Sequence, residues 1–465
     1  MIEFAVNNEK RYYNFNGKLP HVELSSEPAA LPAASPQNSP KLITDTTLRD
    51  GAQDPRFALF PNEAKLKYFD LLHKLDNGTG RIEAVEVFIY QKRDLWVLEK
   101  LLARGYDFPQ VTTWTRATPK DIKLLVDIGG GKIKETGMLA SCSDHHIFDK
   151  MGFHSKQEAM DKYMAPILTA CEHGIRPRVH LEDVTKADIT GWVIPFIQRT
   201  LKETRGLAHF RLCDTLGIGL PDPYADLPMG LPRLVSLICA ATGAELEFHG
   251  HNDFGMATAN CMAAYRYGCK RVNVTVAGLG ERTGNAALEQ IVANYIRFFG
   301  DPGFKIEALG QMEELIHNEV TPTHEKLPII GKSIFTTQAG LHQTGVSRQQ
   351  YADGGLIYLP FEPSVVGRTT AELNRIGALS GMDGLLAILN CQWEAATGEA
   401  NKFTLMSKTV KQIYDHVHES FDGLYDPALD KFCNYRTSFW EPQELLEMAQ
   451  RLLSDSHEEK VESRK

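Results

Sequence analysis

The stretch that decides the fold runs from Glu245 to Asn285 and reads ELEFHGHNDFGMATANCMAAYRYGCKRVNVTVAGLGERTGN. Its apolar residues predict a short strand over Leu246–Phe248, and the run Met256–Tyr267 predicts a helix that ends at Gly268. A second strand is expected over Arg271–Val276. Strand, helix and strand form one βαβ unit, whose parallel pairing brings the carboxyl ends of both strands to the same side.

Two histidines follow the first strand of this unit. His249 and His251 are two residues apart, and residues two apart on a strand point to the same face. Asn285 follows the second strand after the turn Gly278–Gly280, so it can reach the same strand ends. The unit therefore predicts a metal site with open coordination positions.

Short apolar runs alternate with helical patterns along residues 41–300. The runs begin at Leu42, Ile82, Gln110, Ile133, Arg176, Ala208, Glu245 and Arg271. Helical patterns such as Asn62–Leu75 and Gln157–His173 separate them. This order predicts an α/β fold, a (β/α)8 TIM barrel, with a doubly wound sheet as the alternative. The alternative loses support because the first turn lacks the GxGxxG phosphate loop of that fold.

Polar and charged residues stand at the ends of most of these strands, where barrel enzymes place their chemistry. In chain order they are Arg49, Asp50, Glu86, Arg116, Ser143, His146, Glu182, Asp183, Asp214 and Thr215. We expect Glu182 and Thr215 to contact the substrate and Asp214 to orient a neighbouring group. Ser143 and His146 are further substrate-binding candidates, and exposed positions without a role are the alternative for both.

The candidate metal ligands combine hard oxygen with imidazole nitrogen. Asp50 supplies a carboxylate, His249 and His251 supply nitrogens, and Asn285 adds a carbonyl oxygen. Without thiolate, this set suits a divalent metal such as Mn²⁺ or Mg²⁺, with Co²⁺, Zn²⁺ or Fe²⁺ as alternatives. Arg49, beside Asp50, would polarise a carbonyl or stabilise an enolate, and a salt bridge to a barrel carboxylate is its alternative role.

The overall charge disfavours some classes of partner. The 465 residues carry a net charge of −9 with a pI near 6.0, which argues against nucleic acid or an anionic membrane as the main partner. No apolar run is long enough for a membrane span, and the N-terminal residues lack a signal-peptide pattern. Eight cysteines without CxxC spacing favour a reducing, cytoplasmic location.

Four segments are expected along the chain. They are an N-terminal arm or linker over 1–40, the catalytic barrel over 41–300, a small mixed C-terminal subdomain that completes the active site over 301–390, and a helical extension with a charged tail over 391–465. Helices are expected over Gln311–Asn318 and Thr370–Leu389, and the charged tail is expected to fray.

Four motifs resemble those of the metal-dependent Claisen-condensing barrel family, the isopropylmalate and homocitrate synthase group. They are DTTLRDGAQ at 45–53, HGHNDFGMATAN at 249–260, GLGERTGNAALE at 278–289 and AGLHQTG at 339–345. The resemblance implies condensation of acetyl-CoA with a metal-chelated 2-oxo acid, followed by hydrolysis of the thioester. It implies catalytic roles for Arg49 and Glu182, and binding of the oxo acid by Thr215.

The resemblance also implies a dimer. His342, in AGLHQTG, matches the histidine of the family's small C-terminal subdomain, and Tyr358, in YLPFEPSVVG, matches its tyrosine. In relatives these two catalytic residues come from the partner subunit and help to deprotonate the acetyl methyl group. A homodimer with swapped C-terminal subdomains is therefore expected.

Two departures from the family pattern bear on the substrate. Residues 88–93, FIYQKR, replace the usual glycine-phenylalanine-proline run, and Asp54-Pro55-Arg56 replaces small polar residues. Cations near the barrel mouth favour an acceptor with a second carboxylate, such as oxaloacetate or 2-oxoglutarate. The four cations are Arg56, Lys92, Arg93 and Arg116. Arg116 is the first choice, with a salt bridge to Glu86 as its alternative.

With these departures the chain is most similar to the Re-type citrate synthases of the family. Oxaloacetate is therefore the expected acceptor and citrate the expected product. Homocitrate synthase and 2-isopropylmalate synthase are the alternatives within the group. Outside it, the alternatives are a lyase similar to hydroxymethylglutaryl-CoA lyase, a transcarboxylase barrel and a catalytically inactive scaffold. This chain lacks the metal-binding lysine of the transcarboxylase barrels, because it reads LCDTLG at the strand end where that lysine stands.

Overall fold

The computed structural model describes most of the chain in two compact units. The described residues are 3–13, 15, 17–32, 40–116, 118–348, 356–368 and 373–462. The first unit is Met1–Thr323 and the second is His324–Lys465. Among the described residues, no helix is both long and apolar enough to cross a membrane.

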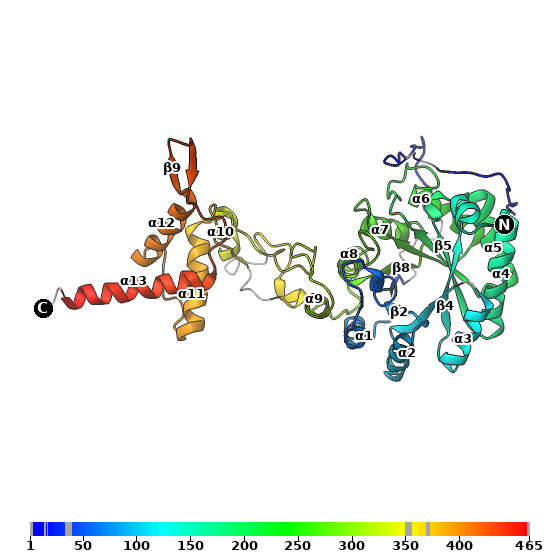
Figure 1. Ribbon diagram of the computed structural model, residues 1–465, viewed down its shortest axis with the longest axis horizontal. Helices are drawn as coiled ribbons and strands as arrows, with labels where there is room; N and C mark the ends of the chain where they lie inside the picture. The colour runs from blue at the N-terminus through cyan, green and yellow to red at the C-terminus, as the bar shows by residue number, and fades with distance from the viewer. Residues whose placement is uncertain are drawn as a thin grey trace. The chain divides into compact units, whose positions relative to one another are not determined.

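Eight parallel strands of the first unit close into a barrel, in which each strand pairs with its neighbours in sequence order and β1 pairs with β8 (Figure 1). The strands are β1 (Leu42–Asp45), β2 (Ile82–Val87), β3 (Gln110–Thr115), β4 (Glu135–Ser141), β5 (Arg176–Glu182), β6 (His209–Asp214), β7 (Leu246–Gly250) and β8 (Arg271–Val274). The predicted (β/α)8 barrel is confirmed. Because all strands are parallel, their carboxyl ends meet at one rim.

Eight helices alternate with the strands and surround them (Figure 1). They are α1 (Asn62–Asp76), α2 (Lys92–Ala103), α3 (Pro119–Gly129), α4 (Lys156–Glu172), α5 (Ile194–Glu203), α6 (Leu231–Thr242), α7 (Ala257–Tyr267) and α8 (Leu288–Phe299). Helix α7 ends at Gly268, whose φ of 132° favours a residue without a side chain. The helix predicted within the deciding stretch is thus confirmed to within one residue.

A network of buried charges fills the barrel beneath its carboxyl rim. Glu86 accepts hydrogen bonds from Arg178, from Arg49 Nε at 2.7 Å and from Arg211 Nη1 at 3.3 Å. Glu247 accepts a hydrogen bond from Arg211 Nη2 at 3.1 Å. Burial would raise the pKa of Glu86, but the surrounding guanidinium groups hold it well below its usual value. The network therefore stays ionised and fixes the position of Arg49.

The N-terminal segment lies on the barrel unit, as expected for an arm. The backbone NH of Asn7 donates to the carbonyl of Gly191 at 2.8 Å, and that of Ser25 donates to Tyr224 at 2.8 Å. Lys156, fully buried, donates to the carbonyl of Glu9 at 2.9 Å. Backbone pairing therefore holds the described parts of this segment against the unit.

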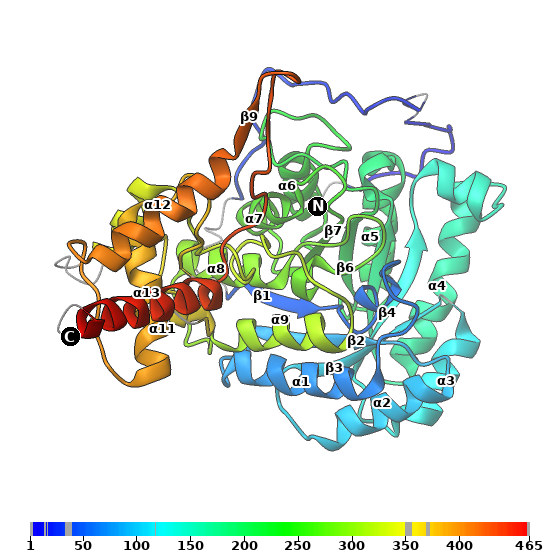
Figure 2. The same ribbon diagram turned by 60° about the vertical axis from the view of Figure 1, so that its left-hand side comes forward.

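The first unit also contains α9 (Ala308–Glu319), which lies alongside α1 (Figure 2). This helix was expected over Gln311–Asn318 and in the C-terminal subdomain. The compact unit instead ends at Thr323. The apolar face of α9, including Leu309, Met312 and Ile316, is buried, which explains why the helix stays with the barrel.

The second unit has a core of its own. It contains α10 (Gly340–Arg348), η8 (Pro363–Val366), α11 (Met382–Thr397), α12 (Lys408–Asp422), the hairpin β9 (Leu424–Asp426) and β10 (Lys431–Cys433), and α13 (Pro442–Glu462). Side chains from α11, α12 and α13, such as Leu389, Ile413 and Leu445, are buried together. Helix α11 spans residue 391, so the predicted helical extension shares one core with the segment before it.

Three local expectations for this unit were wrong. The helix expected over Thr370–Leu389 begins at Met382 and continues to Thr397, because residues 376–381 form a turn in which the Gly381 NH donates to Gln343. The hairpin β9–β10 was missed because its strands have three residues each. The charged tail is helical as far as Glu462 rather than frayed. Residues 369–372 lie outside the described part of the chain.

Candidate metal and substrate site

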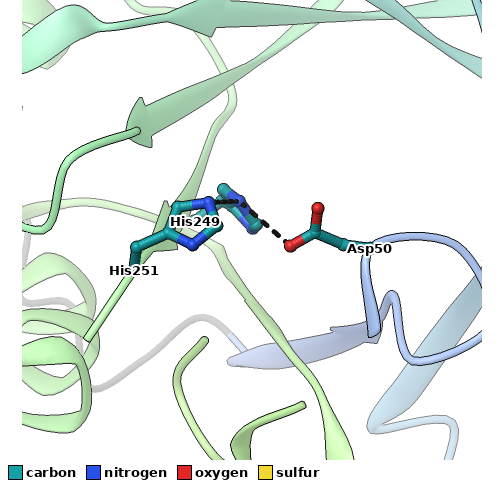
Figure 3. Close-up of side chains that lie close together, drawn as sticks. All are labelled: Asp50, His249 and His251. Carbon is teal, nitrogen blue, oxygen red and sulfur yellow. Dashed lines mark hydrogen bonds and ion pairs between the residues drawn. The ribbon is translucent and has the colours of Figure 1, made fainter. Parts of the chain in front are cut away.

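Asp50, His249 and His251 converge at the carboxyl rim of the barrel (Figure 3). Asp50 follows β1, His249 lies in β7 and His251 is the first residue after it. All three are buried, and one ligand atom from each lies within 4.8 Å of the others. The Nε2 atoms of the two histidines are 3.3 Å apart, and His249 Nε2 is 4.0 Å from Asp50 Oδ2. The structure thus brings together the three predicted charged or imidazole ligands.

The ring of His249 is fixed in the tautomer that a metal ligand requires. Asn273 Nδ2 donates to Thr44 Oγ1 at 2.9 Å, so its Oδ1 faces His249 Nδ1 at 2.8 Å. The proton therefore sits on Nδ1, and Nε2 keeps its lone pair for the cluster. Burial and the neighbouring His251 lower the pKa of His249 to about 3, so the imidazole is neutral at physiological pH.

Asn285 lies directly beside this cluster. Its Nδ2 donates to Asp50 Oδ2 at 2.6 Å and to the Leu279 carbonyl at 2.8 Å. The close approach depends on Gly280, because a Cβ there would lie 2.2 Å from Asn285 Nδ2. The Asn285 Oδ1 atom is buried without a hydrogen-bond partner in the described chain. This oxygen is therefore free to act as a ligand, which is the role that was expected of Asn285.

These residues fit a divalent cation. A buried acceptor without a partner, such as Asn285 Oδ1, costs free energy that a cation would offset. The Nε2 atoms of His249 and His251 face each other at 3.3 Å, so both lie close enough to bind one cation together with Asp50. Burial would raise the pKa of Asp50, but the charge of Arg49 and the nearby histidines lower it, so Asp50 is an anionic ligand. A cation held there would supply Lewis acidity to a carbonyl oxygen of a substrate.

A cavity of about 290 Å³ opens next to the cluster. Six of the predicted site residues line it, namely Arg49, Asp50, Glu182, Thr215, His249 and His251. Eight further lining residues were not predicted as site residues, namely Gln53, Phe88, Trp114, Leu139, His180, Cys213, Glu281 and Arg282. A signal for His180 was present, because it stands two residues before Glu182 on β5 and so faces the same side.

Arg49 is held between two carboxylates. Its Nε donates to Glu86 Oε2 at 2.7 Å, and its Nη1 donates to Asp50 Oδ1 at 3.0 Å. The salt bridge considered as an alternative is therefore present, yet Arg49 also lines the cavity. A guanidinium fixed in this way needs little reorganisation to stabilise negative charge that develops on a substrate oxygen.

Glu182 accepts hydrogen bonds from three side chains at the mouth of β5. They come from Ser141 Oγ, from His146 Nδ1 at 3.1 Å and from Lys150 Nζ at 2.7 Å. Burial raises the pKa of Glu182, but these hydrogen bonds outweigh it and lower the pKa to about 2. A carboxylate with such a low pKa is a weak base, so it is suited to orienting groups rather than to taking a proton.

The low pKa of Glu182 predicts how stability depends on pH. Because its pKa is below the unfolded value of about 4.3, the ionised form stabilises the protein fully above that pH. The parent should therefore unfold at a higher urea concentration than Glu182→Gln at pH 7. That difference should shrink as the pH falls from roughly 5 toward 2. Urea titrations at pH 7, 5 and 3.5 measure it, and a difference that stays constant would contradict the assignment.

Thr215 and Arg282 also line the cavity. Thr215 Oγ1 accepts a hydrogen bond from the Asp183 NH at 2.8 Å, and its carbonyl accepts one from Arg282 Nη2 at 2.6 Å. Arg282 also pairs with Asp253, with 2.8 Å between Nε and Oδ1. The available signal for Arg282 was its place in GLGERTGN, three residues before Asn285.

The other predicted residues follow β4 or end β6, and they make hydrogen bonds to neighbouring groups. Ser143 is fully buried, donates to Asp183 Oδ2 at 2.6 Å and does not line the cavity. His146 approaches the site through its contact with Glu182. Asp214 accepts hydrogen bonds from the NH groups of Ile218 and Gly219, as expected of an orienting residue.

The four cations expected at the barrel mouth do not line this cavity within the described part of the chain. Arg116 pairs with Asp121 at 3.0 Å and is 65% exposed, so it meets neither the cavity nor Glu86. Arg56 is paired with Asp54, two residues before it, at 2.7 Å. Lys92 and Arg93 are exposed on α2. Acidic residues close in sequence neutralise the two arginines, and the cavity's own cations are Arg49 and Arg282.

His342 and Tyr358 lie together in the second unit. Their rings are stacked, with centroids 4.2 Å apart and an interplanar angle of 20°. Both are exposed, Tyr358 to 46%. The stacked pair is therefore available to a neighbouring surface.

Comparison with known proteins places the chain in a family. Residues 41–316 match the family model described as HMGL-like. The chain belongs to the HMGL-like family. It is 34% identical over 400 residues to the citrate (Re)-synthase of Clostridium kluyveri, covering 84% of both chains. It is 36% identical over 318 residues to the citrate (Re)-synthase of Syntrophus aciditrophicus, covering 66% of this chain and 49% of that one.

A third relative is named for a different product. The 2-isopropylmalate synthase 2 of Caldanaerobacter subterraneus is 31% identical over 407 residues. The match covers 86% of this chain and 95% of that protein. Family membership therefore identifies the type of barrel, and the acceptor has to be argued separately.

Proposed function

We propose that this protein is an acyltransferase that joins the acetyl group of acetyl-CoA to a 2-oxo acid and releases CoA. The observation that carries the proposal is the cluster of Asp50, His249 and His251, which shares one cavity with Arg49 and Glu182. The synthases at 34% and 31% identity cover more than four fifths of this chain, which supports the same assignment.

Oxaloacetate is the proposed acceptor and citrate the proposed product. Two relatives, at 34% and 36% identity, are citrate (Re)-synthases. A 2-isopropylmalate synthase at 31% identity supports the second candidate, in which 2-oxoisovalerate is the acceptor. The polar groups along the cavity favour the dicarboxylate, because a branched apolar chain would leave them unpaired.

In this proposal each residue has a distinct task. Asp50, His249, His251 and Asn285 would hold a divalent metal, with Mn²⁺ or Mg²⁺ preferred and Co²⁺ or Zn²⁺ as alternatives. Arg49 would donate to the oxygen of the acceptor carbonyl, where negative charge develops as the new carbon–carbon bond forms. Thr215 would donate to the acceptor carboxylate. Glu182 would orient the bound substrates, since its low pKa makes it a poor base.

The group that deprotonates the acetyl methyl must then come from elsewhere. We assign this role to His342 with Tyr358, contributed by the partner subunit of a homodimer with swapped C-terminal subdomains. The exposed, stacked pair in the second unit supports the assignment. Small-molecule substrates are the only partners proposed besides the second copy, and the eight free cysteines support a cytoplasmic location.

A thiol-release assay tests the proposal. The purified protein, acetyl-CoA and oxaloacetate should release one CoA thiol for each citrate formed. The activity should disappear after chelation and return with Mn²⁺ or Mg²⁺. Thiol release without any 2-oxo acid, or acetyl-CoA formation from citrate and CoA as the only reaction, would contradict the proposed condensation.

A further inference from the structure

His180 is a buried residue that the proposed mechanism does not use. It lies in β5, is 2% exposed and lines the cavity together with Arg49 and the aromatic side chains of Phe88 and Trp114. It stands two residues before Glu182 and two after Arg178, so all three face the barrel interior. His180 thus connects the buried charge network below to the cavity above.

The hydrogen bond to Arg178 fixes the tautomer of His180. Arg178 Nε, which carries a proton at any accessible pH, lies 3.3 Å from His180 Nε2, so Nε2 is the acceptor. In a neutral imidazole the proton is then on Nδ1. Burial and the charges of Arg211, Arg178 and Arg49 lower the pKa of His180 well below its usual value, so the ring is neutral.

The Nδ1–H group remains as a free donor on this ring. It makes no hydrogen bond within the described part of the chain. The polar contacts of His180, with Arg178 and Glu86, are made by its Nε2. A cation that donates to one nitrogen of an imidazole polarises the ring and strengthens the donor on the other nitrogen. The charge of Arg178 therefore strengthens the Nδ1–H donor of His180, which lines the cavity.

The neighbouring strand makes room for this arrangement. Gly137 on β4 faces His180, and a Cβ at that position would lie 2.6 Å from His180 Nε2 and 2.9 Å from Glu86 Oε1. Any side chain at Gly137 would displace the imidazole or separate it from the network. Glycine at position 137 therefore leaves the space that the imidazole of His180 occupies.

We infer that His180 selects the acceptor by donating its Nδ1–H to the second carboxylate of a short 2-oxo dicarboxylate. The inference rests on the proposed function and names the group that recognises its substrate. The cations expected for this task, Arg56 and Arg116, are paired with Asp54 and Asp121 away from the cavity. The cavity's other cation near the rim, Arg282, is already bound to Asp253 and to the Thr215 carbonyl.

Two acceptors that differ only in this group test the inference. Pyruvate is oxaloacetate without the distal carboxylate, so the ratio of kcat/KM for the two acids isolates its recognition. In His180→Ala the ratio of oxaloacetate to pyruvate should fall about 10- to 100-fold, the effect of one hydrogen bond to a charged group. His180→Asn, which keeps a donor near the position of Nδ1, should restore part of the ratio. Because both acids are measured on each variant, a partial loss of folded protein lowers both values of kcat/KM equally and cancels in their ratio.

Arg282→Gln serves as the comparison variant. Since Arg282 is engaged elsewhere, its loss should lower kcat/KM for both acids to a similar extent and leave the ratio unchanged. An unchanged ratio in His180→Ala, or a fall in Arg282→Gln instead, would overturn the assignment. Either outcome, in a parent enzyme that turns over oxaloacetate, leaves the proposed function standing. A parent that does not use oxaloacetate refutes both this inference and the citrate-forming assignment.

Discussion

His249→Ala is expected to lower kcat by about 10³-fold or more while leaving the barrel folded, because several kcal/mol of charge stabilisation at the carbonyl would be lost. His249 lies at the end of β7 and contributes to the rim rather than to packing of the core. Its Nε2 faces the other ligands, so no neighbouring group can replace it. Turnover, metal content after dialysis and circular dichroism together measure the effect.

A graded series makes this test sharper. Asn273→Ala should weaken metal binding by about 10- to 100-fold, because Asn273 holds the His249 tautomer without touching the metal. His173→Ala, at an exposed histidine after α4, is the matched control and should behave like the parent. If His249→Ala binds Mn²⁺ and turns over like the parent, the metal assignment is wrong.

Mixing two inactive variants should restore activity if the active site is shared between subunits. Asp50→Ala removes a ligand in the barrel, and His342→Ala removes the proposed base in the second unit, so each alone should be inactive. In a mixed dimer with swapped subdomains, one of the two sites would keep both residues. Random assortment of equal amounts should then recover about a quarter of the parent activity.

The control for this experiment pairs two barrel variants. Asp50→Ala mixed with His249→Ala should stay inactive, because every site would then lack a metal ligand. Co-expression ensures that subunits exchange, and size-exclusion chromatography gives the oligomeric state. Mixed dimers of Asp50→Ala and His342→Ala that remain inactive would contradict a base supplied by the partner subunit.

The barrel could be predicted because each of its strands is a local signal. The predicted runs beginning at Leu42, Ile82, Gln110 and Arg176 coincide with β1, β2, β3 and β5 at their first residue. Parallel strands put their carboxyl ends at one rim, so residues distant in sequence such as Asp50 and His251 could be placed together from topology alone. The ligand cluster follows from that rule and from the two-residue period of a strand.

Side-chain partners could not be predicted in the same way. Arg116 follows a strand, as a substrate-binding residue would, yet it pairs with Asp121 in the first turn of α3. Which carboxylate captures an exposed arginine depends on a few ångströms of loop geometry that no sequence period encodes. The tautomers of His249 and His180 likewise depend on contacts with Asn273 and Arg178, which lie on a neighbouring strand or two residues away.

The second unit was the least predictable part of the chain. Helix α11 begins at Met382 because a turn precedes it. Gln343, far away in sequence, stabilises this turn by accepting a hydrogen bond from the Gly381 NH. Among the strands that the structure describes, the short β9 and β10 pair only with each other. Long-range contacts of this kind outweigh the local propensity on which sequence reasoning depends.

The ratio of kcat/KM for oxaloacetate to that for 2-oxoisovalerate, measured by thiol release from acetyl-CoA with Mn²⁺ present, tests the central claim most directly. We expect oxaloacetate to be preferred by about 10- to 100-fold, because its distal carboxylate would pair with a donor that the branched acid leaves unpaired. Citrate should be the product. A preference for 2-oxoisovalerate would contradict the citrate-forming assignment. If no thiol is released with either acid, the proposed condensation itself is contradicted.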